Sequence, residues 1–349
     1  MLTDIFADRY SSSPIWSSFE ERDRRLLVQA FRIALEQFYP YWDNKGQERP
    51  EAKQKWKSIH DKLSMELGVE YLSTHFYSYP DATGRSVTAL FTYDYICKNF
   101  VLAPYDNTDP DSFIKRRISF IELIFREKGE DVERARIKME AEIKNDALVK
   151  FGQLTTGIKL PGDYVDGQRA IQATRVGQFN NAVIELNTRF KQAGYKLNYH
   201  NGFIQLSEDV LINEQIETPF WNLVVDPVWK NVDMDMKEAI DLRDTGGRDP
   251  AFYAARALES TIKIISDGKG LTTGKEKGAY NYIDNLGGKR GGNFVAVWEA
   301  NSLKDFFSNI RNPLTHGPGS ADMPALTAQQ TAWAIEFCMS WIRSLVHRP

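Results

Sequence analysis

The stretch Ser308-Asn309-Ile310-Arg311-Asn312-Pro313-Leu314-Thr315-His316-Gly317 places a permanent cation, an amide and an imidazole within six residues near the C-terminus. The residues before it predict a helix from an N-cap at Ser302 to residue 310, because apolar side chains recur at three- and four-residue spacing. Pro313 is expected to end this helix, since proline disfavours the α conformation of the residue before it. Arg311 and Asn312 should then project from a helix end, with His316 in the turn that follows.

This set of side chains matches the needs of phosphodiester cleavage in RNA. An arginine is always charged, and its planar fork fits phosphate oxygens. A histidine transfers protons in both directions near neutral pH. Because the RNA 2′-hydroxyl is a built-in nucleophile, the chemistry requires no metal and no cofactor. The competing interpretation is structural: arginine and histidine near a helix end often only satisfy its last carbonyls.

The run Arg311-Asn312-Pro313-Leu314-Thr315-His316 resembles the Arg-x4-His form of the motif of the HEPN (higher eukaryotes and prokaryotes nucleotide-binding) ribonucleases. The helices around it are similar to those of the abortive-infection C-terminal branch of that superfamily. The whole chain, beginning Met1-Leu2-Thr3-Asp4-Ile5-Phe6-Ala7-Asp8-Arg9-Tyr10, resembles the abortive-infection J-type proteins of bacteria.

The resemblance implies a metal-independent endoribonuclease that acts against phage infection on RNA such as tRNA or mRNA. Its catalytic residues would be Arg311 and His316, assisted by Asn312, and its products would carry a 2′,3′-cyclic phosphate. It also implies a homodimer through the C-terminal domain, in which two motifs face one groove. The spacing is the shortest of the family pattern and Pro313 follows Asn312 directly, which bears on how His316 is oriented.

The helix expected over residues 251–267 carries a polar face that includes Arg256, Glu259 and Lys263. Two interpretations stay open for this face. It could be solvated, with an Arg-Glu pair at i,i+3 and a Glu-Lys pair at i,i+4, or it could face the cleft beside Arg311 and His316. The family resemblance favours the cleft, where these residues would bind substrate.

A second candidate for substrate binding is the basic, glycine-rich segment that contains Lys289 and Arg290. It is no P-loop, because it lacks the Gly-Lys-Ser/Thr sequence after four intervening residues. A solvated connection between helices is the first interpretation, and a loop that contacts phosphate is the second.

Composition limits the remaining choices. With 349 residues, 42% hydrophobic and 26% charged, the chain has the make-up of a soluble globular protein. A net charge of −3 argues against coating of nucleic acid by bulk charge, although it leaves room for a local basic site. Two cysteines and five histidines give no disulfide framework and no metal-binding pattern, which fits a reducing cytoplasm. No apolar run is long enough to span a membrane.

The periodicities predict a mainly α-helical protein in three parts. Residues 1–150 form a helical N-terminal domain, which by resemblance would sense infection or restrain the nuclease. Residues 151–220 form a linker with a short helix from about residue 178 and a β-hairpin, whose Asn201-Gly202 dipeptide is typical of a type I′ turn. Residues 221–349 form a HEPN-like bundle of four to five helices. The aromatic-rich stretch 69–104 is interpreted as core, with base stacking as the alternative.

Two other functions remain open. The C-terminal bundle could be non-catalytic, binding RNA or nucleotide or serving only for dimerisation. The chain could also be the toxin of a toxin–antitoxin pair that works only with a partner.

Overall fold

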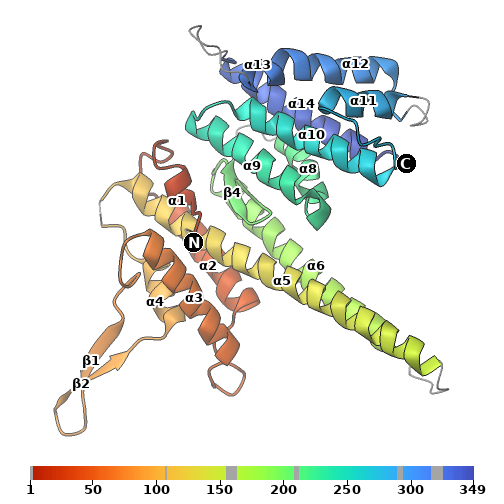
Figure 1. The fold of residues 1–349 in the computed structure, drawn as a ribbon. Helices are drawn as coiled ribbons and strands as arrows, with labels where there is room; N and C mark the ends of the chain where they lie inside the picture. Colours follow the sequence, from red (N-terminus) through yellow and green to blue (C-terminus); the bar gives the residue numbers. More distant parts are fainter. Residues whose placement is uncertain (1–2, 107, 155–162, 208–211, 289–293, 316–324) are drawn as a thin grey trace. The chain divides into compact units, whose positions relative to one another are not determined.

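The computed structural model describes residues 3–106, 108–154, 163–207, 212–288, 294–315 and 325–349. Helices predominate, and the strands of this described part form two small hairpins (Figure 1). The prediction of a mainly α-helical protein is confirmed. The chain separates into two compact units, Met1–Ile204 and Gln205–Pro349. None of the described helices is long and apolar enough to cross a membrane.

The first unit is a helical assembly with two hairpins. Its elements are α1 Phe6–Arg9, α2 Glu21–Arg32, the π-helical η1 Ile33–Phe38, α3 Pro50–Glu66, β1 Phe76–Pro80, β2 Ser86–Leu90, α4 Tyr93–Leu102, α5 Pro110–Leu154, α6 Asp163–Gln192, β3 Leu197–His200 and β4 Phe203–Leu206. The rings of Phe31, Trp56 and Phe120 pack together in its core, with centroids 5.7–6.3 Å apart.

The expectation of a linker over residues 151–180 is wrong for the part that the structure describes. The helix predicted from about residue 178 begins at Asp163 and packs along α5 (Figure 1). Glycine in a helix costs about 1 kcal/mol relative to alanine, and Gly167 and Gly177 both lie inside α6. Burial of Ala182, Leu186 and Phe190 offsets this cost, so packing overrides local preference.

The hairpin predicted around Asn201-Gly202 is confirmed as β3 and β4. Both turn residues have positive φ, 42° for Asn201 and 91° for Gly202, as a type I′ turn requires. The division between the two units falls inside β4, after Ile204. It therefore differs from the boundaries expected at residues 150 and 220, because α6 packs on α5 and the first unit continues to this hairpin.

The hairpin β1–β2 was not predicted, although the sequence Asp81-Ala82-Thr83-Gly84 between its strands is typical of a turn. It projects from the helices of its unit (Figure 1). Phe76, Tyr77 and Tyr79 are each about half exposed, at 44–47%, so the interpretation of these aromatic residues as core is wrong. Aromatic residues that alternate with small polar residues also predict a strand, and this pattern does not require that either face of the sheet is buried.

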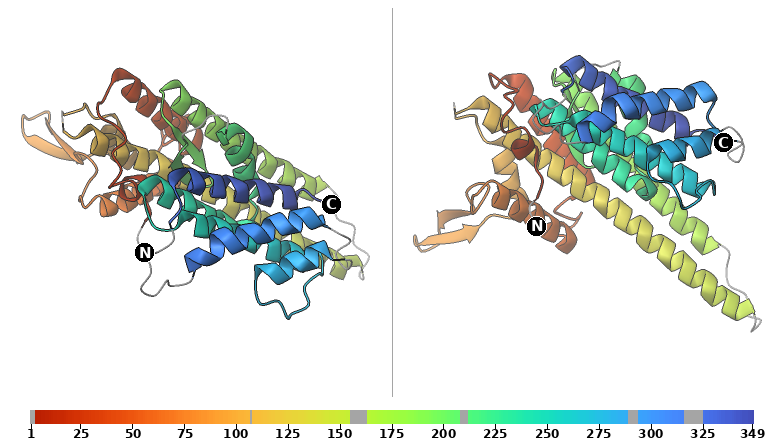
Figure 2. Two further views of the ribbon diagram at one scale, coloured as in Figure 1. Left: turned by 90° about the horizontal axis from the view of Figure 1, so that it is seen from above. Right: turned by 45° about the horizontal axis from the view of Figure 1, so that its top comes forward.

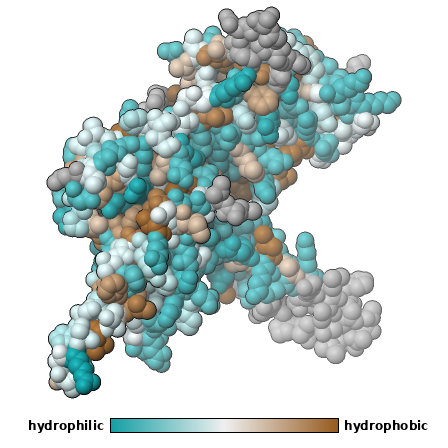
Figure 3. All heavy atoms as spheres, turned by 60° about the vertical axis from the view of Figure 1, so that its left-hand side comes forward, coloured by the Kyte–Doolittle hydropathy of each residue, from teal (hydrophilic) through white to brown (hydrophobic). Residues whose placement is uncertain are grey.

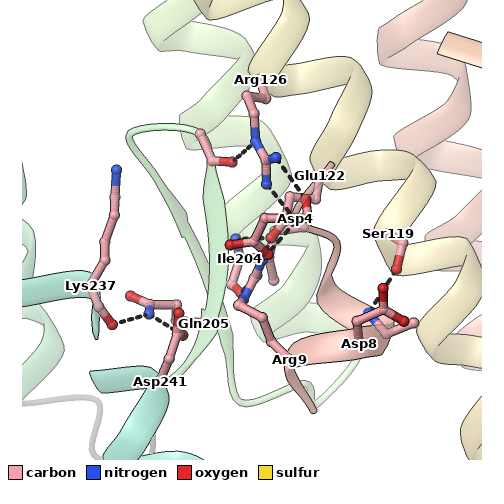
Figure 4. Close-up of polar contacts among 12 residues, drawn as sticks. Asp4, Asp8, Arg9, Ser119, Glu122, Arg126, Ile204, Gln205, Lys237 and Asp241 are labelled. Atoms are coloured by element: carbon pink, nitrogen blue, oxygen red, sulfur yellow. Dashed lines mark hydrogen bonds and ion pairs between the residues drawn. The ribbon is translucent and has the colours of Figure 1, made fainter. Parts of the chain in front are cut away.

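A buried carboxylate ties the N-terminus of the first unit to α5 and β4 (Figure 4). Glu122 is fully buried and accepts hydrogen bonds from both terminal nitrogens of Arg9, from Arg126 Nη2 at 2.8 Å and from the Ile204 N–H at 2.7 Å. Charge-assisted bonds of this kind compensate for the loss of hydration on burial. Three segments distant in sequence are thereby held to one side chain.

The second unit is a helical bundle centred on α10. Its elements are the π-helical η2 Asn213–Glu217, α8 Thr218–Leu223, the 3-10 helix η3 Pro227–Trp229, α9 Lys230–Thr245, α10 Pro250–Gly268, α11 Ala279–Gly287, α12 Val297–Phe306, the π-helical η5 Phe307–Arg311, α13 Asn312–Thr315 and α14 Ala328–Val346. Helix α10 packs against α9, α11, α14 and η5, and α14 lies alongside it in both views of Figure 2. Leu258 and Ile262 of α10 are fully buried. Gln205, the first residue of this unit, donates from its side-chain amide to the Lys237 carbonyl and to Asp241 of α9 (Figure 4).

Candidate functional site

The helix that leads to the motif begins earlier than the sequence predicted. Helix α12 starts at Val297 instead of Ser302, and the Glu299 carboxylate caps it by accepting the Ala296 N–H at 2.8 Å. Glu299 is also bound by the Arg348 guanidinium, and these bonds lower the pKa of its carboxyl group. The observed start of the helix was missed because its cap is Glu299, the third residue of the helix, and the N-cap position holds alanine instead of serine or threonine.

Pro313 does not end this helix, which corrects a second expectation. The chain continues through the π-helical turn η5 into α13, and Asn312 keeps α-helical angles, with φ −63° and ψ −42°. In an α-helix the ring of Pro313 would collide with the carbonyl of Asn309, and the Pro313 nitrogen, which carries no hydrogen, could not donate a hydrogen bond to that carbonyl. The wider π turn carries the chain past that carbonyl. Arg311 is therefore the last residue of a π turn that continues into α13, and it does not project from a helix end.

Arg311 is held against α10 by a carboxylate. Its Nη2 donates to Glu259 Oε2 at 3.2 Å, and its Nη1 lies 3.4 Å from Asn312 Oδ1. The side chain of Arg311 is 27% exposed, and its buried Nε has no hydrogen-bond partner among the described residues. The guanidinium is thus oriented by its neighbours, and the Arg311 side chain keeps partial solvent access.

Of the polar face predicted on α10, Glu259 and Lys263 join Arg311. Lys263 Nζ lies 2.8 Å from Glu259 Oε1, so this carboxylate sits between two cations. Glu259 is nearly buried, at 9% exposure, while the side chain of Lys263 is 43% exposed. One negative charge against two positive charges leaves this cluster with net positive charge, which suits an anion such as phosphate.

Arg256 pairs with a different carboxylate. Its Nη2 lies 3.0 Å from Asp235 of α9, and burial raises the pKa of that aspartate. The guanidinium groups of Arg256 and Arg311 nevertheless flank one ring, with Cζ atoms 5.8 and 5.9 Å from the centroid of Phe252. Sequence reasoning missed Phe252 and Asp235. The i,i+4 spacing of Phe252 and Arg256 on α10 was a signal for the first.

Three candidate residues cannot be placed. His316 lies outside the described residues, as do Lys289 and Arg290 of the glycine-rich segment. Their proposed roles therefore stay predictions. Within the described part of the chain, no group of three or more His, Cys, Asp or Glu side chains could hold a metal ion.

An open groove of about 510 Å³ runs beside the same helix. It lies between α12 and α14 and reaches Asn309 and Ile310, immediately before Arg311. Trp298 and Trp333, 70% and 49% exposed, line it, while Phe337 stacks on Phe306 with centroids 4.6 Å apart. Helix α14 therefore contributes both to the core and to an exposed aromatic surface.

Comparison with known proteins adds a family for the larger part of the chain. Residues 4–222 match the family described as AbiJ N-terminal domain 4, and the match ends before the Arg311 cluster begins. No curated protein and no solved structure matches the chain. The matched segment includes α6 and the β3–β4 hairpin as well as the preceding helices. Because it covers more than half of the sequence, the chain belongs to the AbiJ N-terminal domain 4 family and is an abortive-infection-related protein.

Proposed function

We propose that this protein is a metal-independent endoribonuclease that cleaves RNA during abortive infection, with Arg311, Asn312 and His316 of its C-terminal unit as the catalytic set. The observation that carries the proposal is the state of Arg311. Its guanidinium is oriented by Glu259 and Asn312, and the Arg311 side chain is 27% exposed. The resemblance to HEPN ribonucleases supports the same residues.

In the proposed reaction the RNA supplies its own nucleophile. His316 takes the proton of the 2′-hydroxyl, and the 2′-oxygen attacks the adjacent phosphorus. Arg311 neutralises the phosphate oxygens as charge develops on them. The bond from phosphorus to the 5′-oxygen breaks, and that oxygen takes a proton. The products are a 2′,3′-cyclic phosphate and a free 5′-hydroxyl.

One histidine cannot act as base and acid on opposite sides of an in-line displacement. A two-fold dimer resolves this by bringing a second His316 to the same groove. The aromatic groove between α12 and α14 supports such a dimer, because it is exposed and ends beside Arg311. We therefore place the contact of the proposed C-terminal homodimer there.

The test is cleavage of total cellular RNA by purified protein in the presence of EDTA. Arg311→Ala and His316→Ala should each abolish cleavage and relieve toxicity on expression. Arg343→Ala is the matched control, since Arg343 belongs to the same unit and, within the described part of the chain, donates to the Gln215 carbonyl at 3.1 Å. Cleavage that persists in either site variant, or that is lost equally in the control, refutes the assignment.

The ion pair between Arg311 and Glu259 also favours a second candidate function, in which the guanidinium, engaged at 3.2 Å, fixes η5 on α10 and takes no part in chemistry. The C-terminal unit would then be a non-catalytic module for RNA binding or dimerisation. In that case wild-type and His316→Ala proteins behave alike towards RNA, and Arg311→Ala lowers stability. Cleavage that appears only on co-expression with a genomic neighbour would indicate a toxin that needs a partner.

A further inference from the structure

The hairpin β1–β2 of the N-terminal unit is exposed on both faces. All five residues of β1 are exposed, and Leu90 of β2 is 74% exposed. The rings of Tyr79, Tyr77, Phe91 and Tyr95 form a continuous row, with successive centroids 5.8, 4.7 and 4.3 Å apart. Figure 3 shows apolar side chains on the surface of this projecting arm. A two-stranded hairpin without a covered face is marginal in water, so a partner surface would stabilise it.

The hydrogen-bond pattern shows which backbone groups point outward. The strands are antiparallel, with Ser78 opposite Thr88. Phe91 donates to the His75 carbonyl at 2.9 Å, and Asp81 donates to that of Arg85 at 2.8 Å. These bonds mark the odd-numbered pairs as the hydrogen-bonded ones. The N–H and C=O groups of Ser86, Thr88 and Leu90 therefore point away from β1, and no described strand pairs with them.

This outer edge of β2 lacks the features that normally protect an edge strand. Residues 86–90 contain no proline, no lysine and no other charge, whereas β1 ends in Pro80, which has no N–H. Proteins usually block such edges with charge, proline or a bulge. An uncharged edge with six free backbone groups can accept another strand by β-addition.

Charge indicates what kind of strand fits. Between residues 70 and 98 the charged side chains are Glu70, Asp81 and Asp94 against Arg85 and Lys98. RNA would need cations near the stacking rings to neutralise its phosphates, and the strands themselves supply none. A neutral polypeptide strand meets no such obstacle.

The sequence of β2 matches itself in antiparallel register. A two-fold axis at Thr88 sets Thr88 opposite its own copy, Val87 opposite Ala89 and Ser86 opposite Leu90. No like charges face each other in this arrangement, and Thr–Thr pairs are favourable across strands. We propose that the β1–β2 arm binds the same arm of a second copy through β2, giving a four-stranded sheet.

This contact is independent of the nuclease site and is weaker than a standard interface. Pairing of five residues per chain buries much less than the roughly 1,600 Å² of a typical stable complex. It would therefore add to other contacts between copies. A chain with two self-complementary contacts, one on this arm and one in the proposed C-terminal homodimer, forms assemblies larger than a dimer unless both contacts join the same two copies.

The first test is site-directed crosslinking of the full-length protein. Thr88→Cys is treated with a bismaleimide short enough to join thiols on neighbouring strands. Both native cysteines, Cys97 and Cys338, are buried and give little background. The matched control is Ser78→Cys, whose residue lies directly across the hairpin on the other edge. In the proposed sheet the two Thr88 positions are on adjacent strands, and the two Ser78 positions are about 14 Å apart, three strand spacings.

The second test uses charge. Thr88→Lys should lower the self-association constant about fivefold or more, because two cations then lie directly opposite each other on adjacent strands. An equimolar mixture of Thr88→Lys and Thr88→Glu should restore it in sedimentation equilibrium. Ser78→Lys should have little effect, since about 14 Å exceeds the Debye length of ~8 Å at physiological salt.

Crosslinking of Thr88→Cys together with rescue in the mixture supports the proposal. Equal crosslinking from both cysteine variants, or from neither, overturns it. Unchanged self-association of Thr88→Lys combined with tighter binding of single-stranded RNA would also overturn it and would assign the arm to RNA. RNA cleavage enters none of these readouts, so failure here leaves the proposed nuclease untouched.

Discussion

Removal of the Glu122 carboxylate should destabilise the N-terminal unit severely. In Glu122→Ala two nearly buried guanidiniums, those of Arg9 and Arg126, and the Ile204 N–H lose their common acceptor. The side chains of Arg9 and Arg126 are 9% and 16% exposed, so water replaces the acceptor poorly. Breaking a buried ion pair by removing one partner costs about 3–5 kcal/mol.

The matched control lies two turns further along the same helix. Glu130 and Arg134 form the same i,i+4 pair at 3.2 Å, but their side chains are 51% and 57% exposed. An exposed pair of this kind contributes about 0–1 kcal/mol. Glu130→Ala therefore changes the same residue type on α5 and differs mainly in burial.

Hydrogen exchange followed by mass spectrometry can localise the effect, because peptides from α5 report on this unit alone. At about 1.4 kcal/mol for each factor of ten, Glu122→Ala should lower protection around residues 113–126 by roughly two to three orders of magnitude. Glu130→Ala should lower it less than about fivefold. Equal losses in the two variants would refute the reasoning that burial makes the Glu122 pair important.

Two further predictions concern single side chains. Hydrogen bonds from the hydroxyl and the N–H of Thr273 hold the pKa of Glu276 at about 2, below its ordinary 4.5. The ionised carboxylate therefore stabilises the fold above pH 4.5, and this stabilisation is lost as the pH falls towards 2. Thr273→Ala should raise the pKa of Glu276 in an NMR titration, and an unchanged pKa would contradict the assignment. Gly202→Ala should lower the free energy of unfolding in urea by about 1–3 kcal/mol, since φ is +91° and an added Cβ would lie 3.2 Å from Arg126 Cγ. Gly167→Ala in α6, where an added Cβ meets nothing within 4 Å, should instead raise it by about 0.5–1 kcal/mol. A loss of stability in Gly167→Ala would argue against the helix.

Local chemistry in the sequence was enough where the chain interacts mainly with its neighbours in sequence. The turn at Asn201-Gly202, the end of α9 at the left-handed Gly246 and the apolar face of α10 follow from turn preferences and periodicity. At the candidate site the same reasoning named Arg311 and the polar face of α10, and two of that face's three residues do lie in one cluster with Arg311.

Tertiary structure decided the features in which packing opposes local preference. Helix α6 runs through two glycines because it packs on α5, and the chain passes Pro313 because a π turn widens the helix that packs on α10. The aromatic residues of β1 are exposed because nothing described in the unit covers the hairpin. The pairing of Arg311 with Glu259 also depended on the fold, because residue patterns alone left open whether the polar face of α10 is solvated or lies beside Arg311, 52 residues away. Periodicity and turn chemistry act over a few residues, whereas burial and ion pairing depend on which distant segments meet.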